Sequence, residues 1–227
     1  MVFSATIKTR AESLHLEILP EKTKKAFLRC TEIALFGENG WYLAGGTALA
    51  LHVGHRQSVD LDFFTRRTFD EKKVAEQLST LGQWETTSMS PGTIYGEFMG
   101  AKISLIYYPF FKNSDPMRKI GFVNIITPAD ISVMKIIAIS QRGRKRDFLD
   151  LYWLSQHILS IEKSIERVPK QYTVKQNLSH ILKSMVYFED AEDDPMPATY
   201  FKVSWKEVKD FFIKEVPRVT KHLVNLQ

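Results

Sequence analysis

Two aspartates, Asp60 and Asp62, follow the glycine pair Gly45-Gly46 and the adjacent Thr47. A glycine pair lets the backbone approach a ligand closely, and the N–H groups at the start of a following helix attract an anion such as phosphate. The hydroxyl of Thr47 adds one more donor. Two carboxylates on one face of a strand, roughly 6–7 Å apart along the chain, suit Mg²⁺ held between protein and substrate phosphates. Together, the glycine turn and the two aspartates predict a site that binds a metal ion and phosphate groups.

Three short elements must position these residues. Residues 41–44 are expected to form a strand, residues 47–53 a helix that Gly54 ends, and residues 58–64 a second strand. Alternation along this second strand sends apolar side chains to one face and polar ones to the other, namely Val59, Leu61 and Phe63 against Ser58, Asp60 and Asp62. The alternative without function is that Gly45-Gly46 forms an ordinary turn and the two aspartates line a solvated face of the sheet. The glycine turn and the paired carboxylates together favour the metal and phosphate site.

The rest of the chain changes character near its middle. Further strands are expected at residues 84–89, 93–99, 102–108 and 122–126, with helices at 21–36 and 69–81. Helices alone follow, at residues 129–141, 147–157, 174–188 and 205–226. We predict an α/β (α+β) fold: a small core with a mixed or antiparallel sheet flanked by helices over residues 1–120, and an α-helical part over 121–227 that contributes to the site.

A second group of charged residues falls on the first two of these later helices. Lys135 and Arg142 are seven residues apart with Ala138 between them, so all three share one helix face. Two cations flanking a small residue suit a triphosphate, since Arg offers a bidentate fork and Lys a point charge. Asp147 and Asp150 share a face of the next helix. An ion pair of Asp150 with Arg144 or Arg146 is an equally good explanation for Asp150.

Composition narrows the class of protein. Of the 227 residues, 44% are hydrophobic and 25% charged, so disorder along most of the chain is not expected. No apolar stretch is long enough to cross a bilayer, and the N-terminus MVFSATIKTRAESL lacks the apolar core of a signal peptide. Cys30 is the only cysteine, which excludes an internal disulfide and fits a reducing compartment. We expect a cytoplasmic protein with no membrane partner.

Two sequence blocks carry a family resemblance. The stretch GGTALALHVGHRQSVDLDFF resembles the glycine turn and DxD of the DNA polymerase β-type nucleotidyltransferase superfamily, and in particular of the AbiEii/AbiGii-type toxins. The later stretch KIIAISQRGRKRDFLDLYWL resembles the second conserved block of that branch, and YFEDAEDDPMP is also similar to it. The two blocks, in this order, span residues 43–154.

The resemblance implies an activity and roles. A family member transfers an NMP from an NTP to an acceptor hydroxyl, as the toxin of a toxin–antitoxin pair, in some cases with tRNA as acceptor. A cognate antitoxin is then an expected partner, and the net charge of +5 is compatible with RNA. Asp60 and Asp62 are expected to hold Mg²⁺, Gly45, Gly46 and Thr47 the β and γ phosphates, and Lys135 with Arg142 the leaving pyrophosphate. Asp147 is expected to act as a base or to orient Lys135.

One departure from the superfamily pattern bears on catalysis. The superfamily usually has a third carboxylate on a neighbouring strand, and the corresponding strand here, AKISLIYY, holds Ser104 and no acid. Glu97 on the preceding strand and Asp147 in the helical part are the two alternative sources, and the resemblance favours Asp147. A nucleotide-binding module without turnover and a nucleic-acid-binding interaction protein therefore stay open as alternative functions.

Overall fold

A computed structural model describes residues 14–224, and within it the chain divides into two compact units, Met1–Thr127 and Pro128–Gln227. The N-terminal residues on which the signal-peptide expectation rests lie mostly outside the described range. Among the described residues, no helix combines the length and apolar character that a membrane crossing requires.

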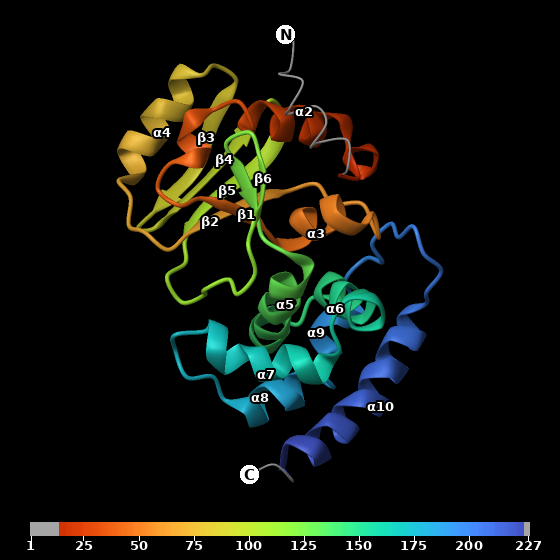
Figure 1. Ribbon diagram of the computed structural model, residues 1–227. Helices are drawn as coiled ribbons and strands as arrows, with labels where there is room; N and C mark the ends of the chain where they lie inside the picture. Colours follow the sequence, from red (N-terminus) through yellow and green to blue (C-terminus); the bar gives the residue numbers. More distant parts are fainter. Residues whose placement is uncertain (1–13, 225–227) are drawn as a thin grey trace. The chain divides into compact units, whose positions relative to one another are not determined.

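One mixed sheet organises the first unit (Figure 1). Its strands are β1 (Tyr42–Ala44), β2 (Leu61–Thr65), β3 (Trp84–Ser90), β4 (Thr93–Phe98), β5 (Ala101–Tyr107), β6 (Arg118–Ile120) and β7 (Val123–Ile125). Their order across the sheet is β3-β4-β5-β2-β1-β7-β6. The β2–β5 and β1–β7 pairs are parallel and the other pairs antiparallel. The mixed α/β fold expected from the sequence is confirmed.

Alternating burial gives the sheet an apolar and a polar face. On β2, Leu61 and Phe63 are fully buried, whereas Asp62 is only half-buried. On β4, Ile94 is buried and the next residue, Tyr95, is 47% exposed. Side chains two apart on a strand share a face, so the face that carries Asp62 is the more accessible one.

Helices of the first unit pack on this sheet. α2 (Glu21–Cys30) contacts β5, and α4 (Glu71–Thr80) contacts β3 and β4. The side chain of Asp70 caps α4 by accepting a hydrogen bond from the backbone N–H of Lys73 at 3.0 Å. The short 3₁₀ turns η1 (Leu16–Ile18) and η2 (Ala34–Gly37) contact α3 and β7. The helix α3 (Gly45–Val53) follows β1 directly and ends at Gly54, whose φ of +64° is left-handed.

The second unit is entirely helical within the described residues. Its helices are α5 (Pro128–Arg142), α6 (Lys145–His157), α7 (Ile161–Gln171), α8 (Leu178–Ser184), α9 (Glu189–Glu192) and α10 (Trp205–Val224). α5 contacts α6, α7 and α8, and α10 packs against α6 and α7. The ring of Phe148 lies within 5.8 Å of the rings of Phe188, Trp205 and Phe212. This aromatic cluster joins α6 to the start of α10.

The sequence analysis is wrong in several local respects, among them the helix expected at residues 21–36, since α2 ends at Cys30. It assigns no element to α7 or β6, although Ser160 caps α7 by accepting from the N–H of Lys163 at 3.3 Å. It starts the helix at 174, whereas α8 begins at Leu178 behind the capping side chain of Asn177. It also expects Val59 in the core, but Val59 is 49% exposed, because β2 begins only at Leu61 and alternation does not apply before it.

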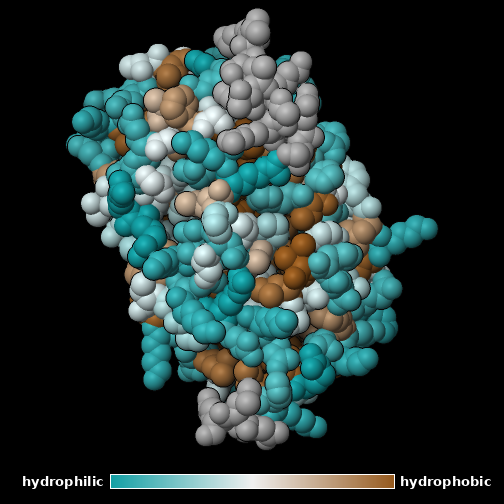
Figure 2. All heavy atoms as spheres, in the orientation of Figure 1, coloured by the Kyte–Doolittle hydropathy of each residue, from teal (hydrophilic) through white to brown (hydrophobic). Residues whose placement is uncertain are grey.

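One face of the molecule is seen in Figure 2. On the face shown in Figure 2, hydrophilic residues cover most of the area and hydrophobic ones appear in scattered groups. Cys30, by contrast, is fully buried on α2, and burial raises the pKa of its thiol. Cys30 is therefore part of the hydrophobic core of the first unit.

Candidate active site

The glycine turn connects β1 to α3 through a backbone shape that requires glycine. Ala44 is extended, and Gly45 has a φ of +70°, a left-handed value that residues with a Cβ rarely adopt. A Cβ at Gly45 would also lie 3.2 Å from Oδ2 of Asp62. The first N–H groups of α3 have no partner within the helix. The turn therefore places anion-binding N–H groups beside the carboxylate of Asp62.

Asp62 lies at the centre of the sheet between β1 and β5. Its register partner on β1 is Ala44, the residue before the glycine turn, and its register partner on β5 is Ser104. The hydroxyl of Ser104, which is buried, donates a hydrogen bond to Oδ1 of Asp62. Ser104 stands on the strand where the superfamily usually has its third carboxylate. Here it instead donates a hydrogen bond that orients the carboxylate of Asp62.

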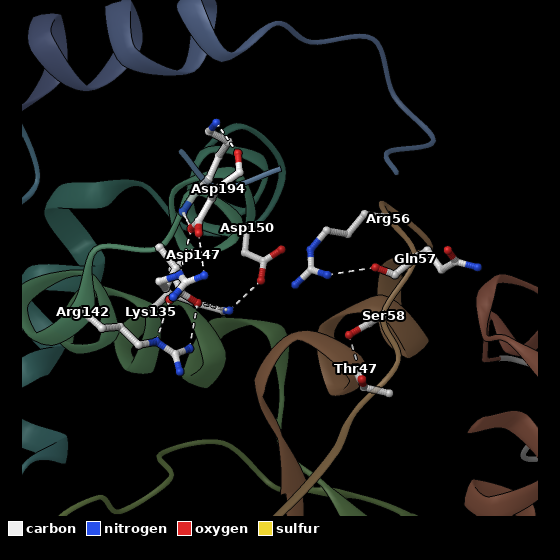
Figure 3. A network of polar contacts seen from close by, with 11 residues as sticks. Thr47, Arg56, Gln57, Ser58, Lys135, Arg142, Asp147, Asp150 and Asp194 are labelled. Atoms are coloured by element: carbon white, nitrogen blue, oxygen red, sulfur yellow. Dashed lines mark hydrogen bonds and ion pairs between the residues drawn. The ribbon is translucent and has the colours of Figure 1, made fainter. Parts of the chain in front are cut away.

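Asp60 lies one residue before β2 and is half-buried. Thr47 on α3 donates its hydroxyl hydrogen to the carbonyl oxygen of Asp60 and also lies 2.8 Å from Oγ of Ser58 (Figure 3). Because a carbonyl oxygen can only accept, this bond uses the hydrogen of the Thr47 hydroxyl. Thr47 therefore fastens the segment that carries Asp60 to the first turn of α3.

The donor set of the first unit fits a substrate-dependent magnesium site. Asp60 and Asp62 are two oxygen donors, and Mg²⁺ commonly binds through one or two carboxylates plus waters and substrate phosphates. Within residues 14–224, no group of three or more His, Cys, Asp or Glu side chains is placed to hold a metal ion. Asp60 and Asp62 are therefore the candidate oxygen donors of the first unit. Nucleotidyltransferases in general use divalent metals.

Glu97 is poorly placed as a third carboxylate. In the β4–β5 hairpin Glu97 pairs with Lys102, and Tyr95 takes the position beside Ser104. The turn of the β4–β5 hairpin lies at Met99-Gly100, where both residues have positive φ. The position of this turn sets the pairing of Glu97 with Lys102. Since β5 lies between β4 and β2, Glu97 is two strand spacings, roughly 10 Å, from β2. This register does not favour Glu97, one of the two sources that the sequence analysis considers for a third carboxylate.

In the second unit, Lys135 forms the centre of a buried ion-pair network (Figure 3). Its Nζ lies 2.7 Å from Oδ1 of Asp147 and 2.6 Å from Oδ2 of Asp150. Arg142 donates from Nε to Oδ2 of Asp147 at 2.9 Å. Lys135 is 4% exposed and both aspartates are fully buried, whereas the side chain of Arg142 is 52% exposed. The two cations of the α5 face thus converge on Asp147.

These contacts bear on the two roles considered for Asp147. Burial raises the pKa of the Asp147 carboxyl, but the charges and hydrogen bonds of Lys135 and Arg142 outweigh it and leave that pKa below its ordinary value. A carboxylate with a lowered pKa is a weak base. The geometry favours Asp147 as the residue that orients Lys135. Asp150 also takes part in an ion pair, with Lys135 on α5.

The acidic segment near residue 190 pairs with the basic segment around residue 144. Arg144 forms an ion pair with Asp194 at 2.5 Å, and the N–H of Lys145 donates to the same carboxylate at 3.0 Å. Nζ of Lys145 donates to the carbonyl oxygen of Glu192 at 2.9 Å. These contacts come from the segment YFEDAEDDPMP, which the sequence analysis relates to the toxin family. The segment therefore holds the start of α6, the helix that carries Asp147.

Two histidines near the end of α3, His52 and His55, are half-buried and buried, respectively. His55 is 2% exposed, and Nε2 of His52 donates to the carbonyl oxygen of Ile126 at 2.9 Å. Burial lowers the pKa of His52 to about 4. His52 is therefore neutral near pH 7 and ties α3 to the end of β7.

Arg56 is a site residue that the sequence analysis does not single out. Its side chain is 4% exposed, and Nη1 donates to the carbonyl oxygen of Gln57 at 2.9 Å. A Cβ at Gly46 would overlap Nη2 of Arg56 and lie 3.2 Å from Oγ of Ser58. The guanidinium therefore lies directly against the glycine turn. The available signal was a cation four positions before Asp60 within the first conserved block.

The fold is similar to that of solved structures. The chain is similar to the crystal structure of a putative nucleotidyltransferase from H. pylori, with a TM-score of 0.50 and 14% identity over 92% of this chain and 99% of that chain. At this identity the likeness shows the fold alone. A likeness to MenT4, nucleotidyltransferase toxin Rv2826c from Mycobacterium tuberculosis H37Rv, has a TM-score of 0.46 and 16% identity over 96% and 93% of the two chains, and that score supports no conclusion. The chain therefore shares its fold with the H. pylori structure.

The family is shown by the sequence. The model of the family described as "Nucleotidyl transferase AbiEii toxin, Type IV TA system" matches residues 26–95 and 108–221. The chain belongs to this family of nucleotidyltransferase enzymes, as the resemblance predicts. It is also 36% identical over 184 residues to an uncharacterized protein of Aquifex aeolicus (strain VF5), covering 78% of this chain and 87% of the relative.

Proposed function

We propose that the protein is a Mg²⁺-dependent nucleotidyltransferase that moves an NMP from an NTP to an acceptor hydroxyl. One observation carries the proposal: Oδ2 of Asp62 lies against the left-handed Gly45 of the β1–α3 turn. A metal-binding carboxylate and a phosphate-binding turn therefore adjoin each other, as nucleotidyl transfer requires.

Each residue of the turn and of β2 has a task in this proposal. Asp60 and Asp62 hold Mg²⁺, which when bound neutralises phosphate charge and polarises the phosphorus under attack. The backbone N–H groups of Gly46 and Thr47 bind the β and γ phosphates. The Thr47 hydroxyl holds the Asp60 carbonyl, and the Ser104 hydroxyl holds Oδ1 of Asp62. The carboxylate of Asp62 and the backbone that carries Asp60 are thus set in place before substrate binds, which reduces the reorganisation needed during the reaction.

The reaction balances without an oxidant or a covalent enzyme intermediate. The acceptor oxygen attacks the α phosphorus, and the bond from that phosphorus to the bridging oxygen of the β phosphate breaks. The products are the acceptor carrying the NMP, pyrophosphate, and a proton that passes to solvent. Negative charge develops on the leaving pyrophosphate, and cations stabilise it.

Lys135 and Arg142 are the proposed cations for that charge. The Lys135 ammonium has three N–H donors, and Asp147 and Asp150 accept from two directions at 2.7 and 2.6 Å. Asp147 orients both Lys135 and Arg142, since each donates to it. Its lowered pKa keeps it charged at neutral pH, which supports this role over that of a general base.

The family supports a proposal for the biological setting. We propose that the acceptor is RNA, with tRNA as the first candidate, and that the protein acts in the cytoplasm as the toxin of a pair with a cognate antitoxin. The net charge of +5 is compatible with an RNA acceptor. The helical second unit contributes Lys135, Arg142 and Asp147 to the reaction in this proposal.

A nucleotide-binding module without turnover is the second candidate function. Ser104 favours it, since it stands opposite Asp62 where a third carboxylate would complete a metal site. Both functions require metal-dependent NTP binding, and only the enzyme releases pyrophosphate.

The test is incubation of the purified chain with each α-labelled NTP, Mg²⁺ and total RNA. We expect label on RNA and an equal amount of pyrophosphate, both abolished by EDTA. Nucleotide binding without either product would favour the binding module, and no nucleotide binding would refute both functions.

A further inference from the structure

We propose that Arg56 is a phosphate-binding residue of the glycine turn, selective for the β and γ phosphates of the nucleotide. The inference rests on the proposed function and adds a residue to its site. Arg56 lies in the segment between the end of α3 and the start of β2.

The first argument is the position of the guanidinium. Nη2 of Arg56 occupies the space that a side chain at residue 46 would fill. Gly46 is the second residue of α3, so its N–H group is one of those left without a helical partner. A phosphate bound at this N–H group would meet the guanidinium beside it. Arginine presents donors in a planar fork that matches phosphate oxygens.

The second argument is that the guanidinium is held in place. The side chain is 4% exposed, and Nη1 donates to the carbonyl oxygen of Gln57 at 2.9 Å, as Figure 3 shows. Ser58 from the same segment lies 2.8 Å from the Thr47 hydroxyl. The segment 56–58 is thereby fastened to the first turn of α3. A fixed fork loses little conformational entropy when a phosphate binds.

The competing explanation is a purely structural role, in which Arg56 braces the segment against Gly46. The two explanations differ in how the effect depends on the ligand. If Arg56 binds the β and γ phosphates, its loss weakens binding of the nucleoside triphosphate and hardly changes binding of the monophosphate. A brace that distorts the turn or lowers the folded fraction changes binding of both to the same degree.

The experiment measures dissociation constants of the full chain for the tri-, di- and monophosphate of one nucleoside in Mg²⁺. Arg56→Gln removes the charge, and Arg56→Lys keeps the charge but loses the fork. Arg67→Gln is the matched control, an exposed arginine beyond the end of β2. Circular dichroism and the melting temperature report the fold of each variant.

We expect Arg56→Gln to weaken triphosphate binding by roughly 10- to 100-fold, the range for hydrogen bonds to charged groups, with the monophosphate changed less than threefold. Arg56→Lys should lie between Arg56→Gln and wild type, and Arg67→Gln should match wild type. Equal losses for all three nucleotides, unchanged binding, or loss of fold in both Arg56 variants would overturn the inference. If wild type binds none of the nucleotides, the proposed function itself fails.

Discussion

The hydroxyl of Ser104 on β5 donates a hydrogen bond to Oδ1 of Asp62, directly across the parallel β2–β5 pair. Oδ2 of the same carboxylate faces Gly45. The sheet and the glycine turn thus fix the orientation of Asp62 from opposite sides. A short polar side chain does this from the strand position at which the superfamily usually provides an acid.

Ser104→Ala should lower the rate of pyrophosphate release by about tenfold or more, because a hydrogen bond to a charged group contributes about 1.5–3 kcal/mol. The Mg²⁺ concentration for half-maximal rate should rise, and Ser104→Thr should restore both values. Ser88→Ala on exposed β3 is the control. An unchanged Mg²⁺ dependence in Ser104→Ala would show that Ser104 does not position Asp62.

Ser104→Asp supplies the missing acid at the same position. It should bind Mg²⁺ more tightly than wild type in the absence of nucleotide, since a third carboxylate replaces a neutral donor. Isothermal titration with Mg²⁺ alone measures this. Equal or weaker Mg²⁺ binding would mean that this strand position does not face the metal.

Thr47→Val should weaken Mg²⁺-dependent NTP binding by up to about tenfold, because the partly buried carbonyl of Asp60 loses its hydrogen bond and a typical intramolecular hydrogen bond contributes about 0.5–1.5 kcal/mol. Thr47→Ser keeps the hydroxyl and should bind as wild type does. Dissociation constants with and without Mg²⁺ check this. If Thr47→Val binds normally, the segment bearing Asp60 is held by other contacts.

Lys135→Met should reduce both stability and activity. It leaves the buried carboxylates of Asp147 and Asp150 without their shared cation, and breaking a buried pair costs about 3–5 kcal/mol. Denaturant unfolding measures that loss. Turnover per folded molecule should fall by about 10²–10³, whereas Lys163→Met on the exposed face of α7 should leave turnover and stability near wild type. Normal turnover in folded Lys135→Met would place Lys135 outside the reaction.

His52 should make the protein sensitive to mild acid. Its folded pKa of about 4 lies below the ordinary histidine value near 6.5, so the unfolded chain binds more protons between these values. Stability therefore falls as the pH drops from about 6.5 to about 4, by at most about 3 kcal/mol. His52→Gln should flatten this part of the profile relative to the exposed control His157→Gln. Parallel profiles for wild type and both variants would contradict the burial of His52.

The sequence predicts those features that depend on local patterning. Alternation locates β2, β4 and β5, and the glycine turn locates the β1–α3 connection. Spacing also brings Lys135 and Arg142 to one face of α5, and both contact Asp147. These features are predictable because strand and helix periodicity is a property of neighbouring residues.

Contacts between elements that are distant in sequence cannot be predicted from local sequence patterns. The Ser104–Asp62 bond depends on the parallel register of β2 and β5, which no local pattern specifies. In the irregular segment before β2, Val59 is exposed and Arg56 lies against Gly46. The hydrogen bond from the Thr47 hydroxyl, rather than strand alternation, holds this segment. Such side-chain contacts with backbone groups are known only once the segments are placed together.

The central claim is that Asp60 and Asp62 are the metal-binding carboxylates of a nucleotidyltransferase. The most direct measurement compares wild type with Asp60→Asn and Asp62→Asn for transfer of α-labelled NTP to RNA in Mg²⁺, with folded fraction checked by circular dichroism. Asn keeps the shape of each side chain and removes its charge. We predict that wild type labels RNA and that each variant is folded but slower by at least about 10². Transfer at the wild-type rate by either folded variant would contradict the claim.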